Sequence, residues 1–594
     1  MQRQREHDSI VFVTLTELGY PRPTIREAIR LAKGINREAG LMVLARLNIY
    51  QSLANLSKDF ELRTKIQEKL ISGVISEHRL RELKDKLQSA HVGYRPLVQR
   101  AQLLVAIKLV AAFGTGNGGN RLESRDDWDV LGELALVINS LFDFGGLAGM
   151  DKHVVDRELA AQMSPIIELE NPSAIANGMV RMSEMLGPIL ERKSSSFVRE
   201  IQTAFLFLTS NSNPTAGLDF QGLLDLVLAL YGFYSARQDD ILNFSGSVFF
   251  NPYNPEHIVS SPYLDGFLKH HSINFGEIIG SLDSPDRGRS YLLDYTLFRR
   301  WPFWRLTPES YICVDPTFLA EKLSSVGFYW SIMNTLDTDE RKEQFAALWG
   351  ELFQEYVFDL FADIYGMGPM SRFFPSPEYE SPQEEAFDTA ILYGDAIILI
   401  QIKGPFVPVE AKYSGEPDSF FDGISQKFGL ERGAAVEQLV RNLKFSLPNS
   451  STPQRKIRGV DLTAVRRVFP VVIYQEPILR FGLVTKVLTE EFVKEIACIA
   501  FRFPVLVRPV IFLNVEDLEA LSQYIKEGHP SFIEFLDAKL NEDPTHFNSF
   551  HDFFAHYFLR QGKIPKKTDD RLEEKWQALT AQSLNRFESG YYQN

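Results

Sequence analysis

Cysteine is scarce in this chain, which has only Cys313 and Cys498 among its 594 residues. Two cysteines cannot build a disulfide framework or a cysteine-rich zinc site, and their scarcity fits a reducing, cytoplasmic setting. Residues 1–8 also lack the apolar core of a signal peptide. Charged residues interrupt the most apolar runs before they reach the length of a membrane span, so the sequence predicts no membrane association.

Positive charge is also in deficit. The chain has 63 Lys and Arg against 77 Asp and Glu, which gives a formal net charge of −14. A free nucleic-acid-binding protein is more often basic. Any contact with nucleic acid therefore needs a local basic patch, or a site that forms only in an activated or assembled state. An apolar content of 45% with 24% charged residues is typical of a soluble globular protein.

The first half of the chain has a helical character. Residues 1–338 carry apolar side chains mainly at helical spacing, and we expect a regulatory or recognition region here with a sub-boundary near residue 240. Within it, a strand is predicted at 311–314, followed by a helix with Asp315 as its N-cap. The chain is too long for one hydrophobic core, so the fold class expected is multidomain α+β.

The second half has the pattern of an α/β domain. Residues 339–594 contain a predicted β-hairpin, followed by strands at 468–474 and 507–513 that alternate with helices. This order predicts an α/β domain with a mixed central sheet.

The hairpin is predicted within 384–404, where two apolar runs meet at Gly394 and Asp395. Gly-Asp between two β-prone runs is typical of a two-residue loop with Gly at its first central position. With that loop, Tyr393 pairs with Ala396, and the rest of the register follows from this pair.

Counting from the turn pairs Asp388 with Gln401, and places Lys403 two residues further along the same face. Directly opposed residues have Cβ atoms about 4.5–5.5 Å apart. Both faces of the ribbon are otherwise apolar, as expected of a sheet covered on both sides. A carboxylate and a lysine at its end need a partner or a metal, because burying an unpaired charge is costly.

This cluster resembles the PD-(D/E)xK superfamily of restriction-endonuclease-like nucleases. The superfamily pattern is an Asp on one strand, then Glu or Asp, any residue and Lys on the next. Asp388 and Lys403 match this pattern, and Gln401 stands where the second acid usually lies; Gln-x-Lys variants are known in the superfamily. The resemblance implies hydrolysis of phosphodiester bonds with Mg²⁺ or Mn²⁺. It covers less than half of the chain, and the alternative is an ordinary hairpin with a structural ion pair.

A further acid on a helix before the hairpin is frequent in the superfamily. The segment 345–361 is strongly amphipathic, with Glu351, Glu355 and Asp359 on one side at i, i+4 spacing. The functional interpretation places Glu355 beside Asp388 as a catalytic residue and metal ligand, with Glu351 as its substitute. The alternative interpretation is a solvated acidic face.

Two other sequence features relate to the resemblance to the PD-(D/E)xK superfamily. A helix with a Gln-Leu step commonly follows the lysine strand in the superfamily, and here Gln438 is the residue expected to reach the site and the nucleic acid. A second acid–lysine motif consists of Glu410 and Lys412, with Asp395 as the partner acid. It is the weaker alternative, because Asp395 falls in the turn and Pro408 weakens a central strand.

Cations and aromatic residues alternate near the expected domain junction. The candidate nucleic-acid contacts are Arg299, Arg300, Trp301 and Arg305. Such a combination can grip phosphates and stack bases, and the alternative is that the arginines cover the tryptophans. The histidines form no site, since His546, His551 and His556 are spread around a helix by their spacing of five.

The resemblance predicts a regulated nuclease. We expect cleavage of DNA, with RNA possible, by a restriction or phage-defence effector, and the alternative is a catalytically inactive scaffold or interaction protein with the nuclease fold. Because the net charge disfavours binding to nucleic acid, we also expect low basal activity and activation by a ligand, by oligomerisation of this chain or by a protein partner.

Overall fold

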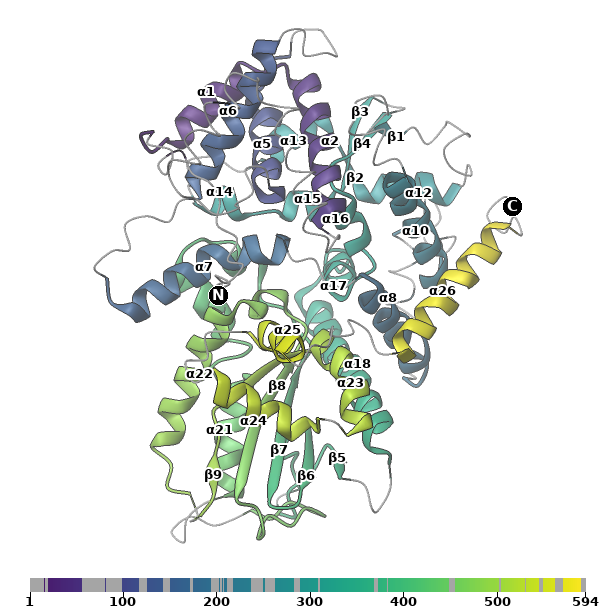
Figure 1. Ribbon diagram of the computed structural model, residues 1–594. Coiled ribbons are helices and arrows are strands. Elements are labelled where there is room, and N and C mark those ends of the chain that lie inside the picture. The colour runs from purple at the N-terminus through teal and green to yellow at the C-terminus, as the bar shows by residue number, and fades with distance from the viewer. Residues whose placement is uncertain are drawn as a thin grey trace.

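A computed structural model places a helical part beside a part built around a sheet (Figure 1). The structure describes residues 20–55, 99–116, 125–142, 150–170, 175–193, 217–236, 262–282, 289–307, 310–367, 372–381, 383–447, 455–501, 504–528, 530–543, 549–560 and 570–588, with positions 15, 81, 202, 206, 208–210 and 249–250. No helix in these ranges is long and apolar enough to cross a membrane.

Helices dominate the chain before residue 339, as the apolar spacing predicts. They are α1 (Ile25–Lys33), α2 (Arg37–Asn55), α5 (Arg100–Phe113), α6 (Arg125–Leu141), α7 (Lys152–Glu170), α8 (Ile175–Glu184), η1 (Met185–Ile189), α10 (Phe220–Ala236), α12 (Pro262–His271), α13 (Phe275–Ser281), α14 (Arg289–Leu293), α15 (Thr296–Arg300), α16 (Pro316–Glu321) and α17 (Ser325–Met333). The predicted cap of α16 is confirmed, since Asp315 Oδ1 accepts a hydrogen bond from Thr317 N at 2.8 Å.

A small sheet accompanies these helices. Its strands, in spatial order, are β1 (Phe249–Phe250), β4 (Ser310–Cys313), β3 (Phe303–Thr307) and β2 (Ser272–Asn274). The sequence predicts β4 but not its three neighbours. The helical part therefore contains a sheet that local patterning does not reveal.

The larger sheet lies in the second half of the chain. Its strands are β5 (Phe373–Pro375), β6 (Thr389–Tyr393), β7 (Ala396–Lys403), β8 (Arg467–Tyr474), β9 (Leu506–Val507) and β10 (Ile511–Asn514). The order is β10-β8-β7-β6-β5, with β9 paired to β8. Strands β5, β6 and β7 are antiparallel neighbours, whereas β7, β8 and β10 run parallel. A mixed sheet in an α+β protein is therefore confirmed.

The predicted hairpin is also confirmed. Tyr393 pairs with Ala396, and the ladder continues to the pair of Thr389 with Ile400. Gly394 has φ 56°, a left-handed conformation that glycine adopts at little cost. The turn chemistry thus fixes the register that brings Asp388 toward Gln401.

Helices cover both faces of this sheet (Figure 1). They are α18 (Asp339–Tyr365), α19 (Val409–Lys412), α20 (Pro417–Ser425), α21 (Ala435–Ser446), η3 (Pro477–Arg480), α22 (Gly482–Ala497), α23 (Val515–Glu527), α24 (Phe532–Glu542) and α25 (Phe550–Arg560). The last helix, α26 (Asp570–Glu588), packs instead against α8 and α10 of the helical part. Helix α18 begins after Thr338, whose hydroxyl accepts a hydrogen bond from Arg341 N at 3.3 Å.

Alternation along β7 divides the apolar side chains between two cores. Ile398 and Ile400 pack in the core that contains the apolar stripe of α18. Ile397 and Leu399 pack in the core that contains α20, α21 and α22. Each fully buried isoleucine contributes about 1.5–3 kcal/mol. The sheet therefore separates α18 from α21, and this arrangement decides which polar residues can meet at its end.

Candidate functional site

Four predicted site residues lie together at one end of the hairpin. Asp388 lies just before β6, and its Oδ2 accepts a hydrogen bond from Ile402 N at 2.5 Å. Lys403 ends β7, and its Nζ donates to Gln438 Oε1 at 2.7 Å. Gln401 is 3% exposed and lies on the same face of β7 as Lys403. The helix after the hairpin thus contacts the lysine of this cluster through Gln438.

The two charged groups of this cluster have shifted pKa values. Burial raises the pKa of Asp388 to about 7, the nearby charge of Glu385 adds to the rise, and the Ile402 N–H and Lys403 oppose it. Burial lowers the pKa of Lys403, which Lys427 also lowers and Asp388 raises. Asp388 therefore exchanges its proton near neutral pH, which is suitable for a group that takes part in proton transfer.

The residues present fit only a weak metal site. Asp388 supplies one carboxylate, and the Gln401 amide, which has no side-chain hydrogen bond to another described residue, can supply a neutral oxygen. In the part of the chain that the structure describes, no group of three or more His, Cys, Asp or Glu side chains is placed to hold a metal ion. Mg²⁺ is nevertheless often bound by one or two carboxylates together with substrate phosphates, so a site completed by the substrate is compatible with this cluster.

The acidic side of α18 does not join the cluster, so the expectation that Glu355 lies beside Asp388 is wrong. Glu355 Oε1 forms an ion pair with Lys193 Nζ at 2.5 Å, and Glu351 contacts the same lysine at 3.1 Å. Asp359 pairs with Arg192 at 2.7 Å. These acids bind cations of the helical part, because α18 packs on the face of the sheet opposite α21.

The alternative motif is also dispersed. Glu410 is exposed and Lys412 is buried, on the short helix α19 rather than on a strand. Asp395 pairs with Arg467 at 3.2 Å, beside the hairpin turn. The length of β7 separates that turn from Lys403. Lys412 follows that far end of β7 and pairs with Glu168 and Glu476, so Asp395 is not its partner acid.

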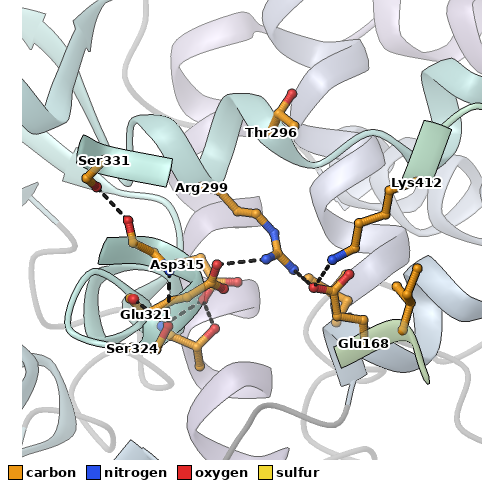
Figure 2. Close-up of polar contacts among 12 residues, drawn as sticks. Glu168, Thr296, Arg299, Asp315, Glu321, Ser324, Ser331 and Lys412 are labelled. Atoms are coloured by element: carbon orange, nitrogen blue, oxygen red, sulfur yellow. Dashed lines mark hydrogen bonds and ion pairs between the residues drawn. The ribbon is translucent and has the colours of Figure 1, made fainter. Parts of the chain in front are cut away.

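Lys412 belongs instead to a buried ion network (Figure 2). Its Nζ lies 2.8 Å from Glu168 Oε1 and 2.8 Å from Glu476 Oε1. Arg299 connects to the same network, 3.0 Å from Glu168 and 2.7 Å from Glu321. Sequence analysis missed the three glutamates, since they come from distant segments and nothing local marks them.

Burial and the nearby cations shift the pKa values of the acids in this network in opposite directions. Burial opposes ionisation of Glu168, but Arg299 and Lys412 outweigh it and lower the pKa of that carboxyl group. Burial raises the pKa of Glu321, against the opposing charge of Arg299. The network joins α7, α15 and α16 to the segments that follow β7 and β8. It connects the helical part to the end of the sheet where Lys403 lies.

The predicted nucleic-acid contacts near residue 300 are therefore corrected in part. Arg299 is 15% exposed at its side chain and has two acidic partners, so it is not available to a phosphate. The Arg300 guanidinium stacks 4.4 Å from the Trp301 ring, and the Arg305 guanidinium lies 5.7 Å from the Tyr311 ring. These contacts favour the alternative in which the arginines cover aromatic side chains.

One histidine has a partner that the sequence does not reveal. His551 Nδ1 lies 2.8 Å from Asp517 Oδ1, across α25 and α23. The charge of Asp517 raises the pKa of His551. His546 lies outside the described residues. The pair links two helices, and no serine, threonine or cysteine nucleophile is hydrogen-bonded to His551 in the described ranges.

Comparisons with protein-family models, with curated proteins and with solved structures find no match to this chain. The geometry of the site is therefore the evidence for the class of this protein.

Proposed function

We propose that this protein is a metal-dependent nuclease of the PD-(D/E)xK type that cleaves DNA. The observation that carries the proposal is the meeting of Asp388, Gln401, Lys403 and Gln438 at one end of the hairpin. The order of elements, with helix α18 before the hairpin and α21 after it, also supports the proposal. It is the order that the resemblance implies.

Each residue of the cluster has a role in this proposal. Asp388 and Gln401 would hold the divalent ion, which supplies charge stabilisation to the phosphate. Burial raises the pKa of Asp388 to about 7 in the absence of the ion, so binding of the ion near neutral pH would displace a proton from this carboxyl group. Lys403 orients the attacking water, and Gln438 fixes the ammonium group through their 2.7 Å hydrogen bond.

A scaffold without catalytic activity is the second candidate. Asp388 accepts the Ile402 N–H just beyond the end of the β6 ladder, which is a structural role. Lys403 has a second acceptor besides Gln438, the Gly433 carbonyl at 3.1 Å. A cluster whose polar groups are occupied in this way could simply terminate the hairpin.

Cleavage assays separate the two candidates. The purified chain is incubated with supercoiled plasmid, single-stranded DNA and RNA in Mg²⁺ or Mn²⁺. The nuclease proposal expects Asp388→Asn and Lys403→Met to abolish cleavage. Asp359→Asn, which removes an exposed acid on α18, is the matched control and should cleave as the parent does. Equal cleavage by all variants would contradict the assignment.

Gln401→Glu gives an independent test, because it restores the acid that the superfamily pattern usually carries. A second carboxylate should tighten Mn²⁺ binding in calorimetry and raise cleavage. If Gln401→Glu changes neither metal binding nor cleavage, and Asp388→Asn leaves metal binding unaltered, the scaffold is the correct candidate.

A further inference from the structure

One short segment reverses the charge balance of the chain. Residues 427–458 contain two acids, Glu431 and Glu437, within a protein of net charge −14. The same segment contains seven bases: Lys427, Arg432, Arg441, Lys444, Arg455, Lys456 and Arg458. Local charge of this kind is what a nucleic-acid contact on an acidic protein requires.

Helix α21 presents part of this charge to solvent along one side. Its buried residues are Ala435, Val436, Leu439, Asn442, Leu443 and Ser446. Gln438 is partly exposed, whereas Arg441 and Lys444 are exposed and follow it at intervals of three residues. Residues at this spacing are neighbours on a helix surface. The three side chains therefore form a row that begins beside the candidate site.

Direct contacts connect the row and its helix to β7 and to the segment that precedes β6. At its start, Gln438 binds Lys403. One turn further, Asn442 Nδ2 donates to the carbonyl of Ala386, two residues before Asp388. The positive charges of Lys427 and Arg441 also reach Lys403, where each lowers the pKa of the ammonium group. The exposed Arg441 and the half-buried Lys427 thus lie next to the candidate site.

Acids near the row leave several bases available. Arg441 lies 3.5 Å from Glu437, and Arg455 lies 3.0 Å from Glu384. Exposed ion pairs of this kind contribute about 0–1 kcal/mol and are readily exchanged. In the described ranges Arg432, Lys444 and Lys456 form no ion pair, and all three are exposed. The segment can therefore offer positive charge to a polyanion without breaking a buried interaction.

We propose that the row on α21, together with the flanking bases Lys427, Arg432 and Lys456, binds the phosphate backbone of double-stranded DNA. The proposal rests on the proposed function, because it places the duplex beside Asp388 and Lys403. Helix α21 has 12 residues, which corresponds to a length of about 18 Å. Each DNA strand carries one phosphate per about 3.4 Å of helix axis, so the length of α21 corresponds to roughly five base pairs. The row replaces the buried Arg299 as the expected phosphate contact.

Equilibrium binding without cleavage tests this surface. The full-length Asp388→Asn variant is titrated in EDTA against a fluorescent duplex of random sequence, at several salt concentrations. The test variant adds Arg441→Gln and Lys444→Gln. The matched control instead adds Arg341→Gln and Lys342→Gln, which remove two exposed bases near the start of α18. Circular dichroism verifies that both variants are folded.

Each lost phosphate contact lowers the slope of log K against log salt by about 0.9. The magnitude of this slope should therefore be about 2 smaller for the test variant than for the parent. The test variant should also bind at least tenfold more weakly at low salt, while the control binds like its parent. Equal slopes for the test and control variants would overturn the proposal. So would an absence of duplex binding by the parent, or tighter binding of single-stranded DNA or RNA than of the duplex.

This outcome is separable from that of the cleavage assays. A protein that binds duplex through the row but never cleaves would retain this surface and lose the nuclease assignment. A protein whose cleavage depends on Asp388, but whose test variant shows an unchanged salt dependence of binding, would keep the nuclease assignment. The proposed DNA-binding surface would then be wrong.

Discussion

Replacing Lys412 by methionine removes the only cation that contacts Glu476 within the described residues. The lysine side chain is 5% exposed, and the carboxylates of Glu168 and Glu476 are 3% and 0% exposed. Methionine keeps the length and apolar volume of the stem. The substitution therefore tests the ion pairs with little change in packing.

The expected loss follows from what remains around each carboxylate. Removing one partner of a buried ion pair costs about 3–5 kcal/mol. Glu168 keeps Arg299 at 3.0 Å. Glu476 keeps the Val407 N–H at 2.9 Å and the Ile478 N–H at 3.3 Å. Because both carboxylates keep partners, we expect Lys412→Met to lose about 3 kcal/mol, the lower end of that range.

Thermal unfolding at pH 7 measures this loss. A change of 1 kcal/mol shifts Tm by about 2–4 °C for a unit of 150–250 residues, so Lys412→Met should unfold at least about 6 °C below the parent. Lys526→Met is the control, because Lys526 pairs at 3.2 Å with Asp363 and both side chains are exposed. That variant should lose less than about 1 kcal/mol. Equal shifts for the two variants would refute the reasoning.

The pH dependence of stability gives a second test of the same ion network. The pKa of Glu168 is lowered in the folded protein. A depressed carboxyl pKa stabilises the fold above the unfolded value and loses that contribution as pH falls through the folded value. Glu168→Gln should therefore be less stable than the parent at pH 7, with the difference shrinking under acidic conditions. A difference that grows on acidification would contradict the ion-pair explanation.

Three further predictions concern the sheet and its helices. Burial raises the pKa of Asp388 to about 7, so the parent should lose stability as pH rises through that value. Asp388→Asn should therefore raise Tm at pH 8 more than at pH 5. A difference in Tm that does not change with pH would contradict this prediction. The pKa of His551 is raised by Asp517, so the contribution of the pair is lost as pH rises through the folded value, and His551→Gln should cost more at pH 5.5 than at pH 8.5 in the same assay. A Cβ at Gly404 would lie 3.1 Å from Gly350 Cα, so urea unfolding of Gly404→Ala should show a loss of about 1–3 kcal/mol. Gly350→Ala, whose Cβ meets no atom within 4 Å, should be neutral or slightly stabilising.

Local patterns by themselves determined the hairpin and the helix before it. Gly394 with Asp395 specified the turn, and the period of two then assigned β7 side chains to opposite faces. The spacing of apolar residues in 345–361 predicted an amphipathic helix, and the apolar side chains of α18 are buried. These features depend on neighbours within a few positions, so the sequence contains the information needed.

Only the tertiary structure decided which charged residues meet. Sequence spacing identified Glu355 as an acid on one side of a helix, but the docking of α18 paired it with Lys193 rather than placing it near Asp388. Lys412 and Glu168 are 244 residues apart in sequence and lie 2.8 Å apart in the fold. A pattern of local apolar residues fixes the side of an element on which an acid lies. The cation that faces this acid depends on how distant elements pack together. The local periodicity of the sequence does not contain that information.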